Sequence, residues 1–403
     1  MLIVQKFGGT SVGDLDRIQN VANRIVATLK EGHQVVAVVS AMSGETNKLI
    51  GYAEYFSHTP ARAEVDMLLS SGERVTASLL SIALNEMGYK AQSMSGRRAG
   101  IVTDHIHTKA RIESIDPTPM QDAIDKGDVI VVAGFQGVNE AGLVTTLGRG
   151  GSDLSAVAIA GALQADLCEI YTDVDGIYTT DPRIEPQAKK LEKISYDEML
   201  ELASLGAKVL QNRSVELAKK LNVNLVTRSS FSEAEGTLIT KEENIMEKPL
   251  VSGIALDRNQ ARVSLGGVID RPGIASDIFG RLAESSVNID MIIQTSGHDG
   301  TTNMDFTVPM NELGDAKQVV ETFISEEEIK AAGYDESICK VSIVGVGMKS
   351  HTGVAAKAFK TMATENINIL MISTSEIKVS MVIDEKYSEL AVRSLHSAYE
   401  LEK

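Results

Sequence analysis

Two glycine loops of this sequence carry residue types that bind anions. The first contains Lys6, Gly8 and Gly9 directly after an apolar run. Adjacent glycines let backbone N–H groups approach an anion with no Cβ in the way, and the lysine adds a positive charge. A helix predicted from Asp14 to Lys30, with Asp14 as its N-cap, directs its positive end at this loop. The pattern is compatible with phosphate binding, but taken alone it is not specific, because a tight strand-to-helix turn also accounts for the glycines and the Walker A spacing is absent from the sequence.

The second glycine loop places Arg149 between Gly148 and Gly150, before a predicted helix of small residues. An arginine held beside a helix start suits bidentate binding of a carboxylate or a phosphate. Ser152 or Asp153 is predicted to cap this helix. A turn and a cap explain the glycines and the serine but do not require the arginine, so anion binding is the favoured interpretation.

Three other segments carry side chains that suit a polar ligand. Glu73 lies in Ser-Gly-Glu-Arg within a predicted helix, where a glycine is costly and indicates close approach of another segment. Its carboxylate suits an ammonium group, and an ordinary helix-surface carboxylate is the alternative. The stretch from Tyr171 to Arg183 holds more hydroxyls and carboxylates than a turn requires. Lys208, predicted to begin a helix, is either a functional cation or a solvated lysine.

Composition narrows the class of protein. The 403 residues suffice for two or three domains, and the net charge of −16 argues against nucleic acid or an anionic membrane as partner. No apolar run reaches membrane-spanning length and no signal pattern is present, so we expect a cytoplasmic protein. Cys168 and Cys339 fit buried thiols of a reducing compartment. His105 and His107 lie in a polar segment without further Cys or His, which favours a solvated loop over a metal site.

The elements that position these residues alternate between strands and helices up to about residue 230. Such alternation predicts an α/β fold with a mainly parallel sheet, helices on both faces and ligands at the carboxyl ends of the strands. Ser195 and Glu198 form a predicted capping box, and the polar stretch at about 230–250 is the expected linker. The predicted strands are 34–40, 128–135, 167–172 and 224–228, and the predicted helices are 60–87, 152–165, 195–205 and 208–221.

The last third contains an internal repeat at an offset of 80 residues. Each unit reads as strand, turn, helix and a strand opened by Asn-Ile, as in half of a ferredoxin-like module. The repeat is either a packing or dimerisation unit or a paired ligand-sensing module, because a glycine turn at a helix start leaves free N–H donors. The identities are Gly273, Ala275, Phe279, Ala283, Asn288, Ile289, Met291 and Ile292, which recur as Gly353, Ala355, Phe359, Ala363, Asn368, Ile369, Met371 and Ile372.

Taken together, these motifs resemble the aspartate kinases over the whole chain. They are Lys-Phe-Gly-Gly, Val-Ser-Ala-Met, Ser-Gly-Glu-Arg, Gly-Arg-Gly-Gly-Ser-Asp, Thr-Asp-Val-Asp-Gly-Ile-Tyr-Thr-Thr-Asp-Pro-Arg and Gly-Ala-Lys-Val-Leu. The repeat is similar to the tandem ACT domains of that family. The resemblance implies an amino-acid-kinase-like domain at 1–245, a first ACT region at 246–338 and a second ACT domain at 339–403, both ferredoxin-like (βαββαβ). The strand near Val251 to Leu256 is expected to complete the second ACT sheet.

The resemblance implies a feedback-regulated enzyme that uses ATP and Mg²⁺ to phosphorylate L-aspartate to 4-phospho-L-aspartate. This reaction is the first step toward lysine, threonine and methionine, and lysine, threonine or both are the expected effectors. The attacking carboxylate is already ionised at neutral pH, so no general base is needed. Repulsion between this anion and the triphosphate is the difficulty, so positioning and positive charge must supply catalysis.

The resemblance also implies a role for each site residue. Arg149 is expected on the substrate α-carboxylate and Glu73 on its α-ammonium, with Ser40, Thr46 and Ser152 lining the pocket. Catalysis is assigned to Lys6, Gly8, Gly9, Arg149 and Asp153, although Asp153 orients either cations or substrate. Nucleotide binding is assigned to Lys6, Phe7, Gly8, Gly9, Thr172, Asp173, Tyr178, Asp181, Arg183, Lys208 and Val209, with Mg²⁺ held by phosphate and water rather than by a protein metal site. Effector binding is assigned to Gly273, Ile274, Ala275, Asn288, Ile289, Asp290, Gln294, Asn368 and Ser373.

Other interpretations remain open at this point. A related kinase would act on N-acetylglutamate, glutamate, carbamate or a nucleoside monophosphate, but Glu73 would then face a neutral amide in the N-acetylated case. A silent amino-acid sensor is opposed by the set Lys6, Glu73, Arg149 and Lys208. Met246 is either an ordinary methionine or an internal start that yields a short regulatory chain. The assembly is accordingly a homo-oligomer or a pairing of long and short chains through the ACT domains.

Overall fold

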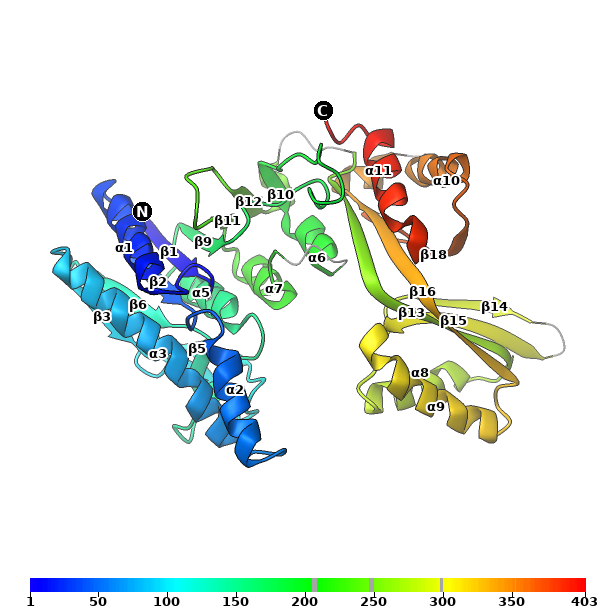
Figure 1. Ribbon diagram of the computed structural model, residues 1–403, viewed down its shortest axis with the longest axis horizontal. Coiled ribbons are helices and arrows are strands. Elements are labelled where there is room, and N and C mark those ends of the chain that lie inside the picture. The colour runs from blue at the N-terminus through cyan, green and yellow to red at the C-terminus, as the bar shows by residue number, and fades with distance from the viewer. Residues whose placement is uncertain (205–208, 246–249, 298–299, 352) are drawn as a thin grey trace. The chain divides into compact units, whose positions relative to one another are not determined.

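The computed structural model describes residues 1–204, 209–245, 250–297, 300–351 and 353–403 (Figure 1). Lys208 and Met246, both singled out from the sequence, lie outside the described residues. Contacts divide the chain into two compact units. The first comprises residues 1–177, 190–203 and 208–247, and the second comprises 178–189, 204–207 and 248–403.

The first unit is built on a mainly parallel sheet in the order β10-β12-β11-β9-β1-β2-β6-β3 within the described ranges. Every pairing is parallel except that of β11 with β12. A smaller sheet, β5-β4-β7-β8, lies in the same unit. The strands are β1 Leu2–Phe7, β2 Gln34–Val39, β3 Ala91–Met94, β4 Ile101–Thr103, β5 Ile112–Ile115, β6 Val129–Ala133, β7 Gln136–Val138, β8 Val144–Thr146, β9 Leu167–Thr172, β10 Lys193–Ser195, β11 Leu225–Ser229 and β12 Thr237–Thr240.

Helices cover both faces of the large sheet, as the alternating sequence predicted. Helices α1 and α3 lie side by side in Figure 1 and bury Ile25 and Leu80 against Phe7 in one apolar core. Because side chains alternate along a strand, Lys6 points to the opposite face, where its partner Asp153 lies in α5. The helices of this unit are α1 Leu15–Lys30, α2 Glu45–Phe56, α3 Arg62–Glu86, α4 Thr118–Ile124, α5 Gly151–Ala162, α6 Tyr196–Ser204 and α7 Asn212–Leu221, with a short 3-10 helix at Glu242–Asn244.

The capping residues in the sequence predicted the starts of some of these helices correctly. Asp14 caps α1 by accepting from the Arg17 N–H, and the reciprocal Ser195 and Glu198 bonds of the capping box are present. One expectation was wrong. Helix α5 has Gly150 at its N-cap without a side-chain cap bond, so Ser152 and Asp153 lie inside its first turn rather than capping it.

Two element boundaries also differ from the prediction. Helix α7 begins at Asn212, four residues later than the expected start at 208. The expected linker at 230–250 contains β12, whose residues 237–240 pair with both β10 and β11 in the large sheet. Its polar composition concealed a short strand in which three of the four residues are buried.

The second unit is a six-stranded antiparallel sheet in the order β14-β15-β13-β16-β18-β17, counted over the described residues. Two long strands run through both repeats. The first half of β13, from Gly253, pairs with the second half of β16, so the strand expected near Val251 lies beside the sheet of the second repeat. The elements are β13 Gly253–Ile269, α8 Ile274–Glu284, β14 Ile292–Ser296, β15 Thr301–Pro309, α9 Leu313–Ser325, β16 Ala331–Val344, α10 Val354–Thr364, β17 Ile369–Thr374, β18 Lys378–Asp384 and α11 Ser388–Ala398, with 3-10 helices at Met310–Glu312, Val346–Ser350 and Glu385–Tyr387.

The segment 178–189 belongs to this second unit although it follows β9 in sequence. The Ile254 N–H donates to the Thr179 carbonyl at 2.7 Å, and the Thr179 hydroxyl bonds the His396 ring at 2.9 Å. Arg393 of α11 donates to the Ile184 carbonyl at 2.9 Å. The segment is therefore tied to β13 and α11 by hydrogen bonds from both its backbone and its side chains.

Both described cysteines, Cys168 and Cys339, are buried free thiols, as the sequence predicted. Burial raises the pKa of each thiol well above its usual range, to about 12 for Cys339. No described helix is long and apolar enough to cross a membrane.

Candidate active site

The carboxyl ends of the central strands meet at one edge of the large sheet. The strand register pairs Phe7 with both Val39 and Tyr171, and it pairs Val39 with Ala133. The loops that follow these strands carry the Gly8-Gly9 pair, Ser40 and Asp173. The fold therefore gathers these loops at the edge where α/β sheets bind ligands.

Lys6 and Asp153 form a largely buried ion pair beside the first glycine loop. The Lys6 Nζ atom lies 2.5 Å from the Asp153 Oδ1 atom, and each side chain is 11% exposed. A Cβ at Gly8 would lie 3.4 Å from the same Nζ atom. Asp153 therefore holds the lysine ammonium against the backbone of the glycine loop, where it is placed to meet an anion.

Glu73 projects from α3 toward the loop after β2. Its Oε1 atom accepts the Ala41 N–H at 3.2 Å, whereas its Oε2 atom is buried with no hydrogen-bond partner among the described residues. Burial raises the pKa of the Glu73 carboxyl to about 7. A buried carboxylate oxygen without a donor is costly unless a ligand supplies one, so the geometry calls for a cationic or N–H group at this oxygen.

Gly72 explains why this approach is possible. A Cβ at Gly72 would lie only 2.8 Å from the Ala41 Cβ, so a larger residue would push α3 away from the loop. The expected close approach at Ser-Gly-Glu-Arg is therefore confirmed. A similar close contact holds the first glycine loop against the loop after β2, because a Cβ at Gly9 would lie 3.1 Å from the Ala41 carbonyl oxygen.

Arg149 occupies an exposed turn at the start of α5. Its neighbours Gly148 and Gly150 have φ angles of 76° and 70°, a left-handed conformation that favours glycine. No hydrogen bond or ion pair involves the Arg149 side chain within the described part of the chain. Ser152, two residues into the helix that follows, is buried and packs where a Cβ of Gly134 would lie, 3.0 Å away. The turn thus presents a guanidinium free to take an anionic ligand.

The residues expected to bind nucleotide fall into two groups. The Gly8 N–H donates to the Tyr171 carbonyl at 3.3 Å, which ties the first glycine loop to the end of β9, next to Thr172 and Asp173. Tyr178, Asp181 and Arg183 instead belong to the second compact unit, where Arg183 is exposed and donates to Asp181 at 2.7 Å. This pairing lowers the pKa of the Asp181 carboxyl.

The remaining predicted residues are placed as follows. The Ser40 N–H donates to the Phe7 carbonyl at 3.1 Å, and Thr46 lies in the first turn of α2. Val209 is half-buried just before α7. No described cluster of three or more His, Cys, Asp or Glu residues is arranged to hold a metal ion.

The residues expected to bind effectors lie around α8 and its counterpart in the second repeat. Gly273 and Gly353 are the N-caps of α8 and α10, each with a φ angle of 95°. Asn288 bonds Glu312, and Asp290 forms an ion pair with the buried Lys340. Gln294 and Asn368 are exposed, while Ser373 is half-buried in β17.

The sequence analysis missed one buried cluster. Asp66, fully buried in α3, bonds His107, Thr108 and Thr146, so His107 is anchored, whereas His105 is exposed as expected of a solvated loop. An acidic residue at the apolar spacing of a helix was the available signal.

Comparisons with known proteins agree with this architecture. Residues 1–228 match the amino acid kinase family, and residues 262–328 and 341–399 each match an ACT domain. The chain is 59% identical to an aspartokinase of Helicobacter pylori and 50% identical to aspartokinase 2 of Bacillus subtilis, covering 100% of itself and at least 98% of each relative. A crystal structure of Escherichia coli aspartokinase III in complex with aspartate and ADP superposes with a TM-score of 0.79 at 26% identity, over 99% of both chains.

These matches cover the whole chain at high identity. The chain belongs to the amino acid kinase family and, within it, to the aspartokinases. It is a kinase with two ACT domains, as the sequence motifs predicted.

Proposed function

We propose that the enzyme transfers the γ-phosphoryl group of ATP to the side-chain carboxylate of L-aspartate. The observation that carries this proposal is the buried, unpaired Oε2 atom of Glu73. The α-ammonium group of an amino acid supplies the missing donor, whereas an N-acetylated substrate would leave the carboxylate facing a neutral amide. Arg149 is available for the α-carboxylate, so the two charged groups at one end of the substrate each find a partner.

The reaction requires the protein to supply positive charge rather than a general base. The substrate carboxylate attacks the γ-phosphorus, the bond from that phosphorus to the β,γ-bridging oxygen breaks, and ADP leaves. Lys6, held by Asp153 against the Gly8 backbone, is placed to neutralise charge on the transferring group. The first turn of α1 and the glycine loop would add N–H donors.

The nucleotide would lie along the loops after β1 and β9. Thr172 and Asp173 follow β9 directly, and we keep Phe7, Tyr178, Asp181, Arg183, Lys208 and Val209 as proposed nucleotide contacts. Mg²⁺ bound with the nucleotide would neutralise phosphate oxygens and would be held mainly by phosphate and water ligands.

The ACT domains would make the enzyme responsive to lysine, threonine or both. Escherichia coli aspartokinase III, which is 27% identical, has been crystallised with lysine and aspartate. Glycine N-caps at Gly273 and Gly353 leave helix N–H groups for an effector carboxylate. Feedback of this kind fits the first step of lysine, threonine and methionine synthesis, which the two buried thiols would place in the cytoplasm.

The assembly would be an oligomer joined through the ACT domains. If Met246 is an internal start, the native gene also yields a short chain with both ACT domains. Expression of the native gene with and without Met246→Leu tests this on a denaturing gel. A short product of about 17 kDa, a size within the usual domain range, should appear only without the substitution. If the short chain is still made after the substitution, or if no short chain appears with either gene, the homo-oligomer is the better description of the assembly.

Hydroxylamine trapping tests the reaction. The purified enzyme, ATP and Mg²⁺ should form an aspartyl hydroxamate from L-aspartate at the rate at which ADP appears. N-Acetylglutamate, glutamate, carbamate and nucleoside monophosphates are the matched alternatives. Faster turnover of any of these, or no turnover of any substrate, would overturn the proposal, and the last result would favour a silent sensor.

A further inference from the structure

A buried carboxylate outside the proposed pocket links its two recognition elements. Asp66 has no exposed surface, yet it accepts three kinds of donor. Its Oδ2 atom lies 2.7 Å from the His107 Nδ1 atom, both oxygens lie 3.1 Å from the Thr108 N–H, and Oδ1 accepts the Thr146 hydroxyl at 2.5 Å. A buried carboxylate with this many partners holds the groups around it in place, because each of its oxygens accepts two hydrogen bonds that stabilise the buried charge.

Helix α3 connects the hydrogen-bonded cluster around Asp66 to Glu73. Asp66 and Glu73 lie seven residues apart in α3, which is close to two helical turns, so they share a face of the helix. The position of Asp66 along the helix therefore sets the position of the Glu73 carboxylate. The Gly72 contact with Ala41 keeps that part of α3 against the loop after β2.

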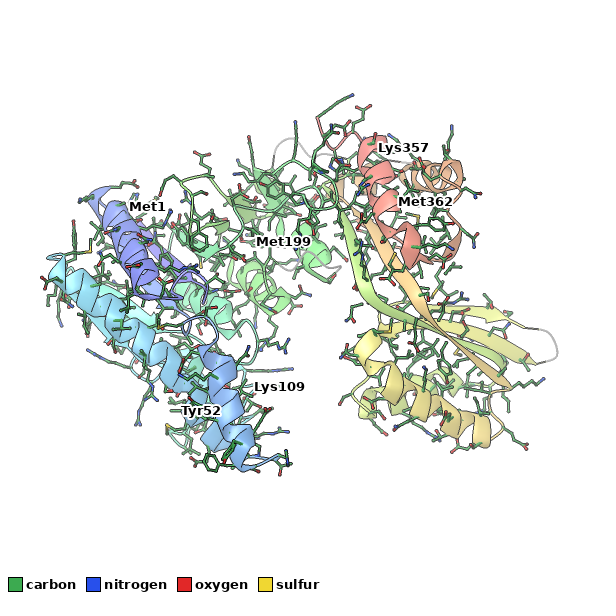
Figure 2. The ribbon with its side chains drawn as sticks, viewed as in Figure 1. Met1, Tyr52, Lys109, Met199, Lys357 and Met362 are labelled. Carbon is green, nitrogen blue, oxygen red and sulfur yellow. The ribbon has the colours of Figure 1, made fainter. Side chains whose placement is uncertain are left out.

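The loop that contains Thr108 connects the same cluster to the turn that carries Arg149. Thr108 has a left-handed φ of 70°, which is unfavourable for a residue with a branched Cβ and is held by the Asp66 bonds. A Cβ at Gly148 would lie 3.3 Å from the Thr108 carbonyl oxygen, so the two turns touch. Lys109, labelled in Figure 2, marks this loop on the ribbon.

Further bonds hold the loop to the strand that enters the arginine turn. The Ala110 N–H donates to the Thr146 carbonyl at 2.9 Å. Arg213 of α7 donates to the Leu147 carbonyl at 2.8 Å and to the Ala110 carbonyl at 3.3 Å. Movement of Thr108 would therefore be transmitted to the turn that presents Arg149.

We propose that Asp66 is a positioning residue that sets the separation between Glu73 and Arg149, and thereby the fit of the amino and carboxyl groups of the substrate. This inference rests on the proposed function of that pocket. Asp66 touches neither substrate nor nucleotide in this account, and it acts through the His107–Thr108 loop on one side and through α3 on the other.

The test compares Asp66→Asn with the wild-type enzyme. Asparagine keeps the size of the side chain and one acceptor but removes the charge that holds the three donors. We expect the KM for aspartate to rise about 10-fold, the scale for losing one charge-assisted contact, with kcat and the KM for ATP within about twofold. Asp128→Asn is the matched control, because Asp128 is 9% exposed in the same unit and pairs with Lys90 and Gln92 at the opposite edge of the sheet.

A double mutant separates positioning from general stability. In an Arg149→Ala background, Asp66→Asn should raise the KM for aspartate by a smaller factor than in the wild-type enzyme, because the part of its effect that acts through the arginine turn is already gone. His107→Ala, at a partly exposed position, serves if Asp66→Asn fails to fold, and it should raise the same KM less. Isothermal titration with aspartate provides a readout that does not depend on turnover.

The outcomes are distinct. A wild-type enzyme that neither binds nor phosphorylates aspartate refutes the proposed function itself. A wild-type enzyme that does both, while Asp66→Asn and His107→Ala keep a normal aspartate affinity, refutes the positioning role. Equal losses for aspartate and ATP, or an effect as large in Asp128→Asn, would show that Asp66 is merely structural.

Discussion

The two units of this protein offer different kinds of group to a charged ligand. In the first unit, charged side chains are buried around the strand ends, where Lys6 and Asp153 pair at 11% exposure each and Glu73 keeps one unpaired oxygen. In the second unit, the candidate sites are glycine turns at the starts of α8 and α10, which offer backbone N–H groups. We therefore expect the first unit to stabilise charge that moves during a reaction, and the second to bind a ligand reversibly.

This comparison predicts that side-chain substitutions in the first unit affect turnover far more than substitutions in the second. Lys6→Ala should give the largest effect, a fall in kcat of about 10²–10³-fold, the scale for removing one preorganised electrostatic contact. Steady-state kinetics at saturating aspartate and ATP measure it, with thermal melting as the control for folding. Near-normal turnover in a folded Lys6→Ala enzyme would remove Lys6 from the catalytic assignment.

The pH dependence of aspartate binding tests the role of Glu73. Burial raises the pKa of this carboxyl to about 7, so in the free enzyme it is protonated at lower pH and cannot pair with an ammonium. The apparent KM for aspartate should therefore rise by about 10-fold as the pH falls from 8 to 6, while the KM for ATP stays constant. Glu73→Gln should raise the KM and flatten its pH profile. A wild-type profile that is already flat would contradict the assignment.

The smallest predicted effect concerns the two glycine caps. Gly273 and Gly353 share a φ of 95°, where any other residue is strained by about 1–2 kcal/mol, so alanine at either position should distort the helix start. Gly273→Ala and Gly353→Ala should keep uninhibited activity and weaken inhibition by lysine or threonine about fivefold at whichever cap binds the effector, a coupling change of about 1 kcal/mol. Inhibition curves of the two variants, each the control for the other, identify the repeat. If neither curve moves, the caps are not effector sites.

The sequence predicted the parts of the molecule whose local signals agree with the tertiary fold. The capping residues Asp14 and Ser195, the close approach at Gly72 and the order of strands and helices all follow from propensity and periodicity, which act over a few residues. The family resemblance added the identity of the domains, because several weak motifs in a fixed order are together specific. The roles of Arg149 and Glu73 in binding remain predictions.

Long-range contacts account for what the sequence could not show. Nothing near Asp66 in sequence indicates that its partners come from residues 107, 108 and 146, because only the fold brings α3, that loop and β8 together. The same holds for β12, whose polar neighbours look like a linker until its pairing with β10 and β11 is seen. The N-cap of α5 is Gly150 rather than the expected Ser152 or Asp153. A tertiary contact requires glycine at this position, because a Cβ at Gly150 would lie 2.0 Å from the Gln211 side chain.

Strands β13 and β16, which both repeats share, determine when the growing chain can form its antiparallel sheet. The first part of β13, residues 253–257, leaves the ribosome early, but its partner strand is formed by residues 340–344, which follow 83 to 91 residues later. Until then its apolar face and the edge that pairs with β16 are uncovered, which exposes the nascent chain to misassembly. The second repeat cannot complete its part of the sheet without the strand that precedes the first repeat, so the pair should fold as one cooperative unit, and removing residues 253–257 would leave the second repeat one strand short.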